Sequence, residues 1–417
     1  MNNIQKRNLR ILAVMGVLYF IVFIFPNAAT KGSSNPKVFM HVDEYVTYPI
    51  VERMLDLGPD VNENWGRLII YGDYHYGYPF YFLSMLSLLP LRLAQGQGFF
   101  EQTQINILIL RQMISVLPMI LTAGVLTYVL THFRQLWKSV VTFLFILTIP
   151  EVVRGNMHWW HPDALMVLSI ALTFLFLDLD NYRQGKYFLL AAAACGMASA
   201  IKLMGFFFFI AIPIYLLVAM RKKNYGLKKI LTAGIIFVMV MLVVIIISNP
   251  FLFYAGPRRD MIAIQTEKSD EISSGYSHEE SYYYALGPKY WEWTHAVSFG
   301  PPYFSIVLLL LLTAVGIVSV KKEQYWIMLA WIATIGIYLM WFVAPKPGHY
   351  LLPLLLPLYA SVLVGFDAFE VGWKSGKKWA RWVSTAVGGA YGIILITQVI
   401  FQITADIPQY LEYFIIN

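Results

Sequence analysis

Residues 230–248 read ILTAGIIFVMVMLVVIIIS, a run without a charged side chain. An α-helix needs about 20 apolar residues to cross roughly 30 Å of hydrocarbon, so this run predicts a transmembrane helix. Just before it stand five positive charges, Arg221, Lys222, Lys223, Lys228 and Lys229. Short loops rich in Lys and Arg stay on the cytoplasmic side, so the helix is expected to leave the cytoplasm here.

The same pattern continues along the chain. Hydrophobic residues make up 58% of the 417 residues and charged residues 13%, a composition that a soluble globule could not bury. We predict eleven transmembrane helices, at about 10–27, 105–131, 139–153, 163–179, 186–201, 203–220, 230–248, 302–320, 325–344, 350–367 and 382–403. The predicted fold class is an all-α polytopic membrane protein with 1–417 as one transmembrane domain, its C-terminal helices in 302–417.

The distribution of Lys and Arg predicts a cytoplasmic N-terminus. This orientation requires residues 79–93, PFYFLSMLSLLPLRL, to form an interfacial helix on the outer surface, because a twelfth span would turn the 221–229 cluster outward. The net charge of +7 then reflects cytoplasmic loops facing anionic lipids, and nucleic acid is not an expected partner. The single cysteine, Cys195, excludes an intrachain disulfide. We expect the cytoplasmic membrane of a bacterium or archaeon.

Two outer segments, 28–104 and 249–301, are much longer than the other turns, and long loops are usually functional. The first contains His41-Val42-Asp43-Glu44 shortly after the first span, and then the interfacial helix. Arg111, Asp163 and Lys202 stand at outer ends of spans, where charged side chains commonly line a water-filled cavity. The unusual polar residues therefore gather on one face.

Such a cavity suits the transfer of a sugar from a phosphate to a hydroxyl group. One carboxylate would take the proton of the attacking hydroxyl, as in inverting glycosyl chemistry. The leaving phosphate departs as a stable anion and needs positive charge near it. Aromatic rings would stack on the sugar, and the sequence offers Tyr76, Tyr78, Trp159, Trp160, Trp291 and Trp293.

Over most of residues 1–365 the chain resembles the GT-C superfamily of polytopic glycosyltransferases, which includes the protein O-mannosyltransferases and the bacterial aminoarabinose transferases. The most specific motif is His41-Val42-Asp43-Glu44 after the first span. Weaker matches follow in order, namely Tyr76-Gly77-Tyr78-Pro79-Phe80-Tyr81, Arg111, His161-Pro162-Asp163, Ala200-Ile201-Lys202 and His349-Tyr350-Leu351-Leu352-Pro353. Gly77-Tyr78-Pro79 departs from the family, which has two prolines there.

The resemblance implies that Asp43 is the catalytic base and that Glu44 assists it. The expected donor-phosphate ligands are Arg258, Arg259, Lys202, His349 and Arg111, and the expected substrate contacts are His41, Tyr78, His161, Asp163, Tyr350 and Trp160. No cofactor is certain, and a divalent metal ion at Asp43 and Glu44 is left open.

The predicted function is an inverting glycosyltransferase that moves a sugar from a polyprenyl-phosphate-sugar donor to a hydroxyl group of a lipid, glycan or protein on the outer membrane face. The expected partners are this donor, the acceptor and membrane lipids. The alternative is a transporter or flippase of a lipid-linked amphiphile. Transporters hold their sites near the bilayer midplane between internal repeats, and the sequence has neither a convincing repeat nor most of its polar residues in mid-span.

Overall fold

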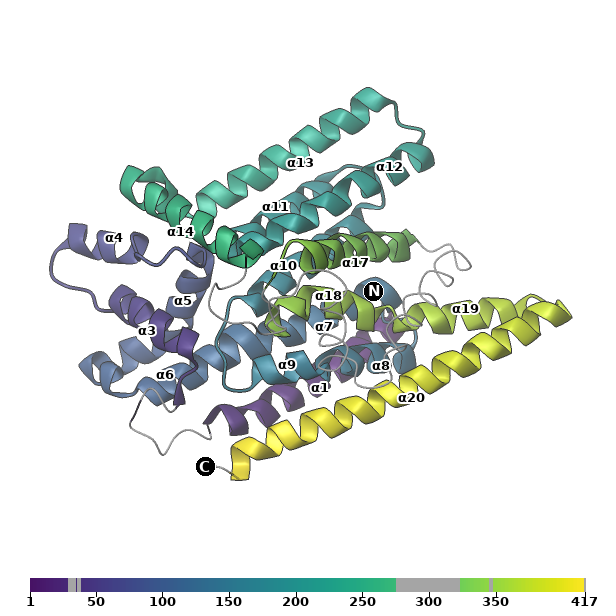
Figure 1. The fold of residues 1–417 in the computed structure, drawn as a ribbon, viewed down its shortest axis with the longest axis horizontal. Coiled ribbons are helices and arrows are strands. Elements are labelled where there is room, and N and C mark those ends of the chain that lie inside the picture. Colours follow the sequence, from purple (N-terminus) through teal and green to yellow (C-terminus); the bar gives the residue numbers. More distant parts are fainter. Residues whose placement is uncertain (29–34, 36–38, 275–322, 345–347, 416–417) are drawn as a thin grey trace.

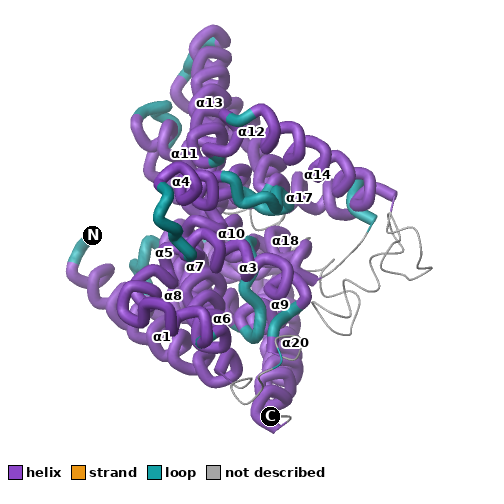
Figure 2. Tube along the Cα trace, turned by 90° about the vertical axis from the view of Figure 1, so that its left-hand side faces the viewer, coloured by secondary structure: helices purple, strands orange, loops and turns teal. Residues whose placement is uncertain are grey.

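The computed structural model describes residues 1–28, 35, 39–274, 323–344 and 348–415. In these ranges the chain consists of helices joined by loops and forms no β-strand, as Figure 2 shows. Long helices lie side by side as a bundle (Figure 1). The predicted all-α fold class is confirmed.

Six helical segments are long and apolar enough to cross a membrane. They are α1 (Asn3–Ala28), the continuous α6 (Thr103–Leu110), η3 (Arg111–Val116) and α7 (Leu117–Thr131), η4 (Leu203–Ala211) with α12 (Ile212–Lys223), α13 (Leu227–Ser248), α18 (Gly348–Ala360) with α19 (Val362–Lys374), and α20 (Lys378–Ile415). A seventh is bent by 62° between α8 (Leu136–Leu147) and α9 (Pro150–Asn156), where Pro150 cannot continue the hydrogen bonding of α8.

Three more helices coincide with predicted spans but are shorter or carry more charge, namely α10 (Asp163–Asp180), α11 (Lys186–Ile201) and α17 (Glu323–Trp341). The predicted span at 302–320 lies outside the described residues, and so do Trp291 and Trp293. The chain is thus a polytopic membrane protein, whereas the predicted number of eleven spans is not confirmed.

Helices α10 and α11 form the centre of the bundle, with α7 packed on α10 and α13 packed on α11. Small residues allow this close approach. A Cβ atom at Gly196 would lie only 2.6 Å from the carbonyl oxygen of Met241 on α13, as is usual where membrane helices pack closely. The lone cysteine, Cys195, is free and buried in the same helix.

Four helices outside these spans gather at one end of the bundle (Figure 1), namely α3 (Val42–Leu55), α4 (Val61–Ile69), α5 (Tyr78–Gln95) and α14 (Ala255–Ser274). Helix α5 contains the predicted interfacial segment 79–93 and is not among the helices apolar enough to cross a membrane. It packs against α3 and α11. These contacts bring the first outer segment next to the ends of the central helices.

Candidate active site

Four helix ends meet at this end of the bundle. Helix α3 begins after His41, α10 begins at Asp163, α11 ends at Ile201 beside Lys202, and His349 lies in the first turn of α18. Helix ends leave backbone groups unpaired and allow charged side chains to face one another without entering the bilayer. The site is built from residues that are far apart in the sequence.

The adjacent carboxylates Asp43 and Glu44 have different environments. Glu44 is fully buried, and Arg111 donates to it from Nε at 2.8 Å and from Nη2 at 2.6 Å. The backbone N–H groups of Trp160 and His41 donate to the same carboxylate at 2.6 and 2.9 Å. Four donors therefore occupy Glu44 and connect α3 to η3 and to the segment before α10.

Asp43 remains accessible, with 36% of its side chain exposed. The His41 ring lies 3.5 Å from its carboxylate and also accepts the backbone N–H of Asp43 at the start of α3. Burial raises the pKa of Asp43, but the neighbouring histidines, His41 first among them, outweigh it and hold the pKa below its usual value. Asp43 is thus an ionised carboxylate that a substrate can reach.

A buried chain of polar groups lies opposite Asp43. Lys202 donates to Asp163 at 2.6 Å, the other oxygen of Asp163 lies 3.0 Å from Nδ1 of His161, and Nε2 of His161 lies 2.9 Å from the hydroxyl oxygen of Tyr76. Burial lowers the pKa of His161 although Asp163 counteracts this effect. Burial also raises the pKa of Tyr76, and the charge of Asp43 adds to the shift. Asp43 therefore lies close enough to this chain of groups for its charge to act on Tyr76 and His161.

Aromatic rings connect His41, beside Asp43, with His161 and His349. The Trp159 ring lies 4.8 Å from the His41 ring, 4.3 Å from the His161 ring and 4.7 Å from the His349 ring, measured between centroids. Tyr350 lies beside His349, and the Lys202 ammonium group lies 5.0 Å from the centroid of the Tyr350 ring. Six of the predicted residues therefore form one cluster of neighbouring side chains, with Asp43 beside its His41. They are His41, His161, Asp163, Lys202, His349 and Tyr350.

A metal ion has one geometric candidate among the described residues. His161, Asp163 and His349 offer ligand atoms within 4.8 Å of one another. The charge of Asp163 is, however, already balanced by Lys202. At the predicted pair, Glu44 has its carboxylate occupied by four donors, so it and Asp43 do not face a common point.

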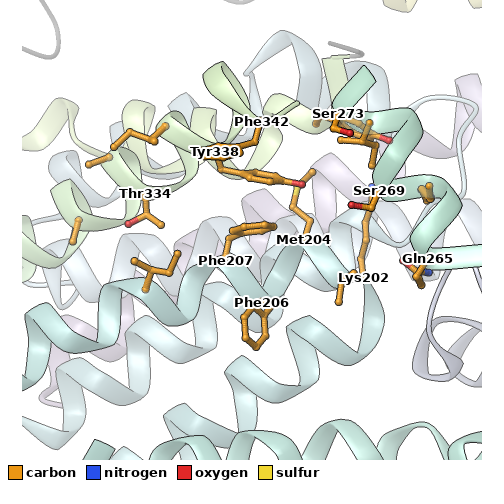
Figure 3. Close-up of a pocket in the computed structure, with 18 of the residues that line it drawn as sticks. Lys202, Met204, Phe206, Phe207, Gln265, Ser269, Ser273, Thr334, Tyr338 and Phe342 are labelled. Carbon is orange, nitrogen blue, oxygen red and sulfur yellow. The ribbon is translucent and has the colours of Figure 1, made fainter. Parts of the chain in front are cut away.

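A deep groove begins beside this cluster. Its volume is about 740 Å³, and it lies between η4, α12, α14 and α17. Figure 3 shows Lys202, Gln265 and Ser269 at one end, Thr334 at the other, and Phe207 and Tyr338 between them. Most of the lining is apolar, and it includes Phe206, Ile210, Ile214, Ile337 and Phe342. The groove therefore has a cationic end beside the cluster and an apolar body.

Lys268 of α14 also lines the cationic end, and we did not predict it from the sequence. Its ammonium group lies 5.0 Å from the centroid of the Tyr76 ring. In the part of the chain that is described, no carboxylate forms an ion pair with Lys268. Burial and the charge of Lys202 lower its pKa to about 8. Positive residues are scarce on the predicted outer side, which is the signal that could have identified Lys268.

The other predicted residues lie elsewhere. Arg111 is buried against Glu44, and Trp160 is buried, stacks on Phe80 and donates from Nε1 to Ser84. Tyr78 is buried and stacks on Phe82. Two arginines, Arg258 and Arg259, are exposed on α14 and donate to backbone carbonyls within six residues of themselves.

Gly77 explains how the loop before α5 reaches Lys202. Its N–H donates to the carbonyl of Ile201 at 2.9 Å, and a Cβ atom there would lie 1.5 Å from the carbonyl oxygen of Ala200. The next residue, Tyr78, donates its N–H to the side chain of Asn249. Only glycine allows this approach, which sets Tyr76 beside the end of α11.

Comparisons with known proteins identify the fold. No protein-family model matches the sequence, and no curated protein matches it. Among solved structures, ArnT from Cupriavidus metallidurans bound to undecaprenyl phosphate is similar at a TM-score of 0.53 and 12% identity, over 96% of this chain and 75% of that one. The oligosaccharyltransferase of Archaeoglobus fulgidus in its apo form is similar at a TM-score of 0.58 and 13% identity, over 97% of this chain and 56% of that one.

The archaeal oligosaccharyltransferase AglB from Archaeoglobus fulgidus, in complex with an inhibitory peptide and a dolichol-phosphate, is similar at a TM-score of 0.53 and 12% identity, over 95% of this chain and 56% of that one. ArnT and AglB are both GT-C membrane glycosyltransferases. Identity this low carries information about the fold alone. The chain therefore has the GT-C fold of polytopic membrane glycosyltransferases.

Proposed function

We propose that this protein is an inverting glycosyltransferase that moves a sugar from a polyprenyl-phosphate donor to a hydroxyl acceptor on the outer face of the membrane, with its N-terminus in the cytoplasm. The observation that carries the proposal is the position of Asp43. Its carboxylate is accessible, and its neighbour His41 lies against the Trp159 ring, which also contacts His161 and His349. Lys202 and Tyr350 of the same cluster line the cationic end of an apolar groove.

The groove matches a lipid phosphate in shape and in charge. A polyprenyl chain would lie along the apolar body, where its burial from water is favourable. The phosphate would lie between Lys202 and Lys268, because both ammonium groups line the same end. ArnT is bound to undecaprenyl phosphate and AglB to a dolichol-phosphate, which supports a donor of this class here.

The chemistry then needs one base. Asp43 accepts the proton of the acceptor hydroxyl while the oxygen attacks the anomeric carbon and the bond to the phosphate oxygen breaks. The electron pair of that bond leaves with the phosphate, so one negative charge passes from Asp43 to the leaving group. Lys202 and Lys268 stabilise this charge. The rings of Trp159 and Tyr350 would contact the sugar.

The remaining predicted residues receive positioning roles. We assign the Glu44–Arg111 pair and Trp160 to holding the start of α3, which fixes the positions of His41 and Asp43. Glu44 accepts hydrogen bonds from Arg111, Trp160 and His41. Donor-phosphate binding is assigned to Lys202 and Lys268 rather than to Arg111, Arg258 and Arg259.

The test uses the full chain in lipid nanodiscs with a panel of polyprenyl-phosphate sugars. Wild type is compared with Asp43→Asn and with the matched control Asp60→Asn, an exposed helix cap on α4 at which asparagine caps equally well. We expect transfer by wild type and by the control, and a loss of about 10²–10⁴-fold for Asp43→Asn. Equal transfer by Asp43→Asn would exclude this base, and lipid movement across vesicles without transfer would favour the flippase.

A further inference from the structure

We propose that His75, oriented by Asp73, binds the phosphate of the donor through its protonated imidazole and so is a third cationic contact at the end of the groove. This inference rests on the proposed function and adds a residue to its anion site. His75 lines the same cavity as Lys202 and Lys268. About half of its side chain, 53%, is exposed.

The imidazole is held on one edge. Its Nδ1 lies 2.5 Å from Oδ1 of Asp73, and the backbone N–H of His75 donates to the same oxygen at 3.2 Å. The other oxygen of Asp73 accepts the hydroxyl of Tyr81, which is fully buried, at 2.8 Å. Asp73 is therefore fixed by the protein core, and it fixes the ring in turn.

The backbone of the same loop is attached to α14. Gln265 donates from Nε2 to the carbonyl oxygens of Tyr74 and His75, at 2.7 and 3.2 Å. Gln265 lies one helical turn before Lys268, so the hydrogen bonds that hold His75 also keep the loop next to this lysine. A ring that only capped the turn would not need to line the same cavity as Lys202 and Lys268.

The contact with Asp73 leaves Nε2 as the ring atom that can meet an anion. Because Nδ1 donates to the Asp73 carboxylate, a neutral imidazole would direct the lone pair of Nε2 toward the phosphate, whereas a protonated one directs an N–H group. The donor phosphodiester carries one negative charge and the lipid-phosphate product carries two. The hydrogen bond from Nε2 therefore strengthens as the bond to the sugar breaks, while the proton of the acceptor goes to Asp43 and that of His75 stays in place.

The test measures binding and needs no knowledge of the sugar. Undecaprenyl phosphate and the uncharged alcohol undecaprenol are titrated into the full chain in nanodiscs, for wild type, His75→Asn, Asp73→Asn and the control His132→Asn. The control removes a histidine that is ion-paired with Asp178 at 3.1 Å, at a site outside the groove. Thermal unfolding of each variant verifies that it is folded.

We expect His75→Asn to weaken binding of undecaprenyl phosphate about tenfold, the scale of one hydrogen bond to a charged group, and to leave undecaprenol within about twofold. Asp73→Asn keeps a side chain that can cap the turn but loses the charge that favours the imidazolium, so it should show a smaller loss of the same selectivity. His132→Asn should match wild type.

Three results are decisive. Phosphate binding by His75→Asn within twofold of wild type overturns the inference, and so does an equal loss for both lipids, which would indicate a structural role. If His75→Asn does not fold, the inference is tested with Asp73→Asn, by comparing its affinities for undecaprenyl phosphate and undecaprenol in the same way. Wild type that does not prefer undecaprenyl phosphate to undecaprenol would contradict the proposed donor class itself, whatever the role of His75.

Discussion

Neutralising Glu44 should destabilise the protein, whereas neutralising its neighbour Asp43 should not. In Glu44→Gln the side chain keeps one acceptor oxygen, while four donors still point at it from Arg111, Trp160 and His41. The new amide N–H₂ group cannot accept any of them. Arg111 then carries an unpaired charge at 1% exposure.

The expected cost follows from this geometry. Breaking a buried ion pair by removing one partner costs about 3–5 kcal/mol, because the remaining charge stays desolvated. Asp43 is 36% exposed and has one ionic neighbour, His41, at 3.5 Å, and an exposed pair of this kind contributes roughly 0–1 kcal/mol. The two variants should therefore differ in unfolding free energy by about 2–5 kcal/mol.

The assay is denaturant unfolding in detergent followed by circular dichroism, with sugar transfer measured on the same samples. Asp43→Asn should unfold like wild type and lose transfer, and Glu44→Gln should unfold much earlier. The double variant Glu44→Gln with Arg111→Met removes the stranded charge and should regain part of the lost stability. If Glu44→Gln is as stable as Asp43→Asn, the buried ion pair does not stabilise α3 and this reasoning is refuted.

Three further outcomes are expected. Donor affinity should fall as pH rises through about 8, because the charged form of Lys268 binds phosphate and its pKa is lowered to about 8. In Lys268→Gln the affinity for undecaprenyl phosphate should no longer fall as pH rises through about 8. A fall of unchanged size would show that another group titrates there. Gly77→Ala should reduce transfer about 10²-fold, since its Cβ atom would force Ala200 and so Lys202 to move by about 1 Å or more; normal kinetics would show that the loop can relax. Ile210→Trp should fill the groove and raise the KM of long-chain donors more than that of short-chain donors, and an equal change for both chain lengths would place the lipid elsewhere.

Part of the site was predictable because its signals are local. Asp43 stands in the outer segment shortly after the first predicted span, and His161, Asp163, Lys202 and His349 stand at ends of apolar runs on the same predicted side. The structure brings them together. Charge at such a position is costly in lipid unless it faces a cavity, so the sequence itself marks it.

Other assignments depended on side-chain direction, which the sequence does not encode locally. Adjacent residues on a helix point to different sides, so Asp43 faces the cavity while Glu44 enters the core and pairs with Arg111, 67 residues away. Lys268 lies in the long outer segment 249–301, which we expected to be a loop, yet residues 255–274 form a helix whose lysine lines the groove.

The sequence by itself determined that this chain is an integral membrane protein, and it showed which polar residues lie at the ends of the apolar segments. Hydrophobic length and charge are properties of single segments. Only the tertiary structure decided which of these residues share a cavity. That depends on contacts between distant segments, such as Gly77 against Ala200 and α14 against the loop at 71–77. It is these contacts that bring Lys202 and Lys268 to one end of an apolar groove, beside the cluster that contains Asp163, His161 and His349.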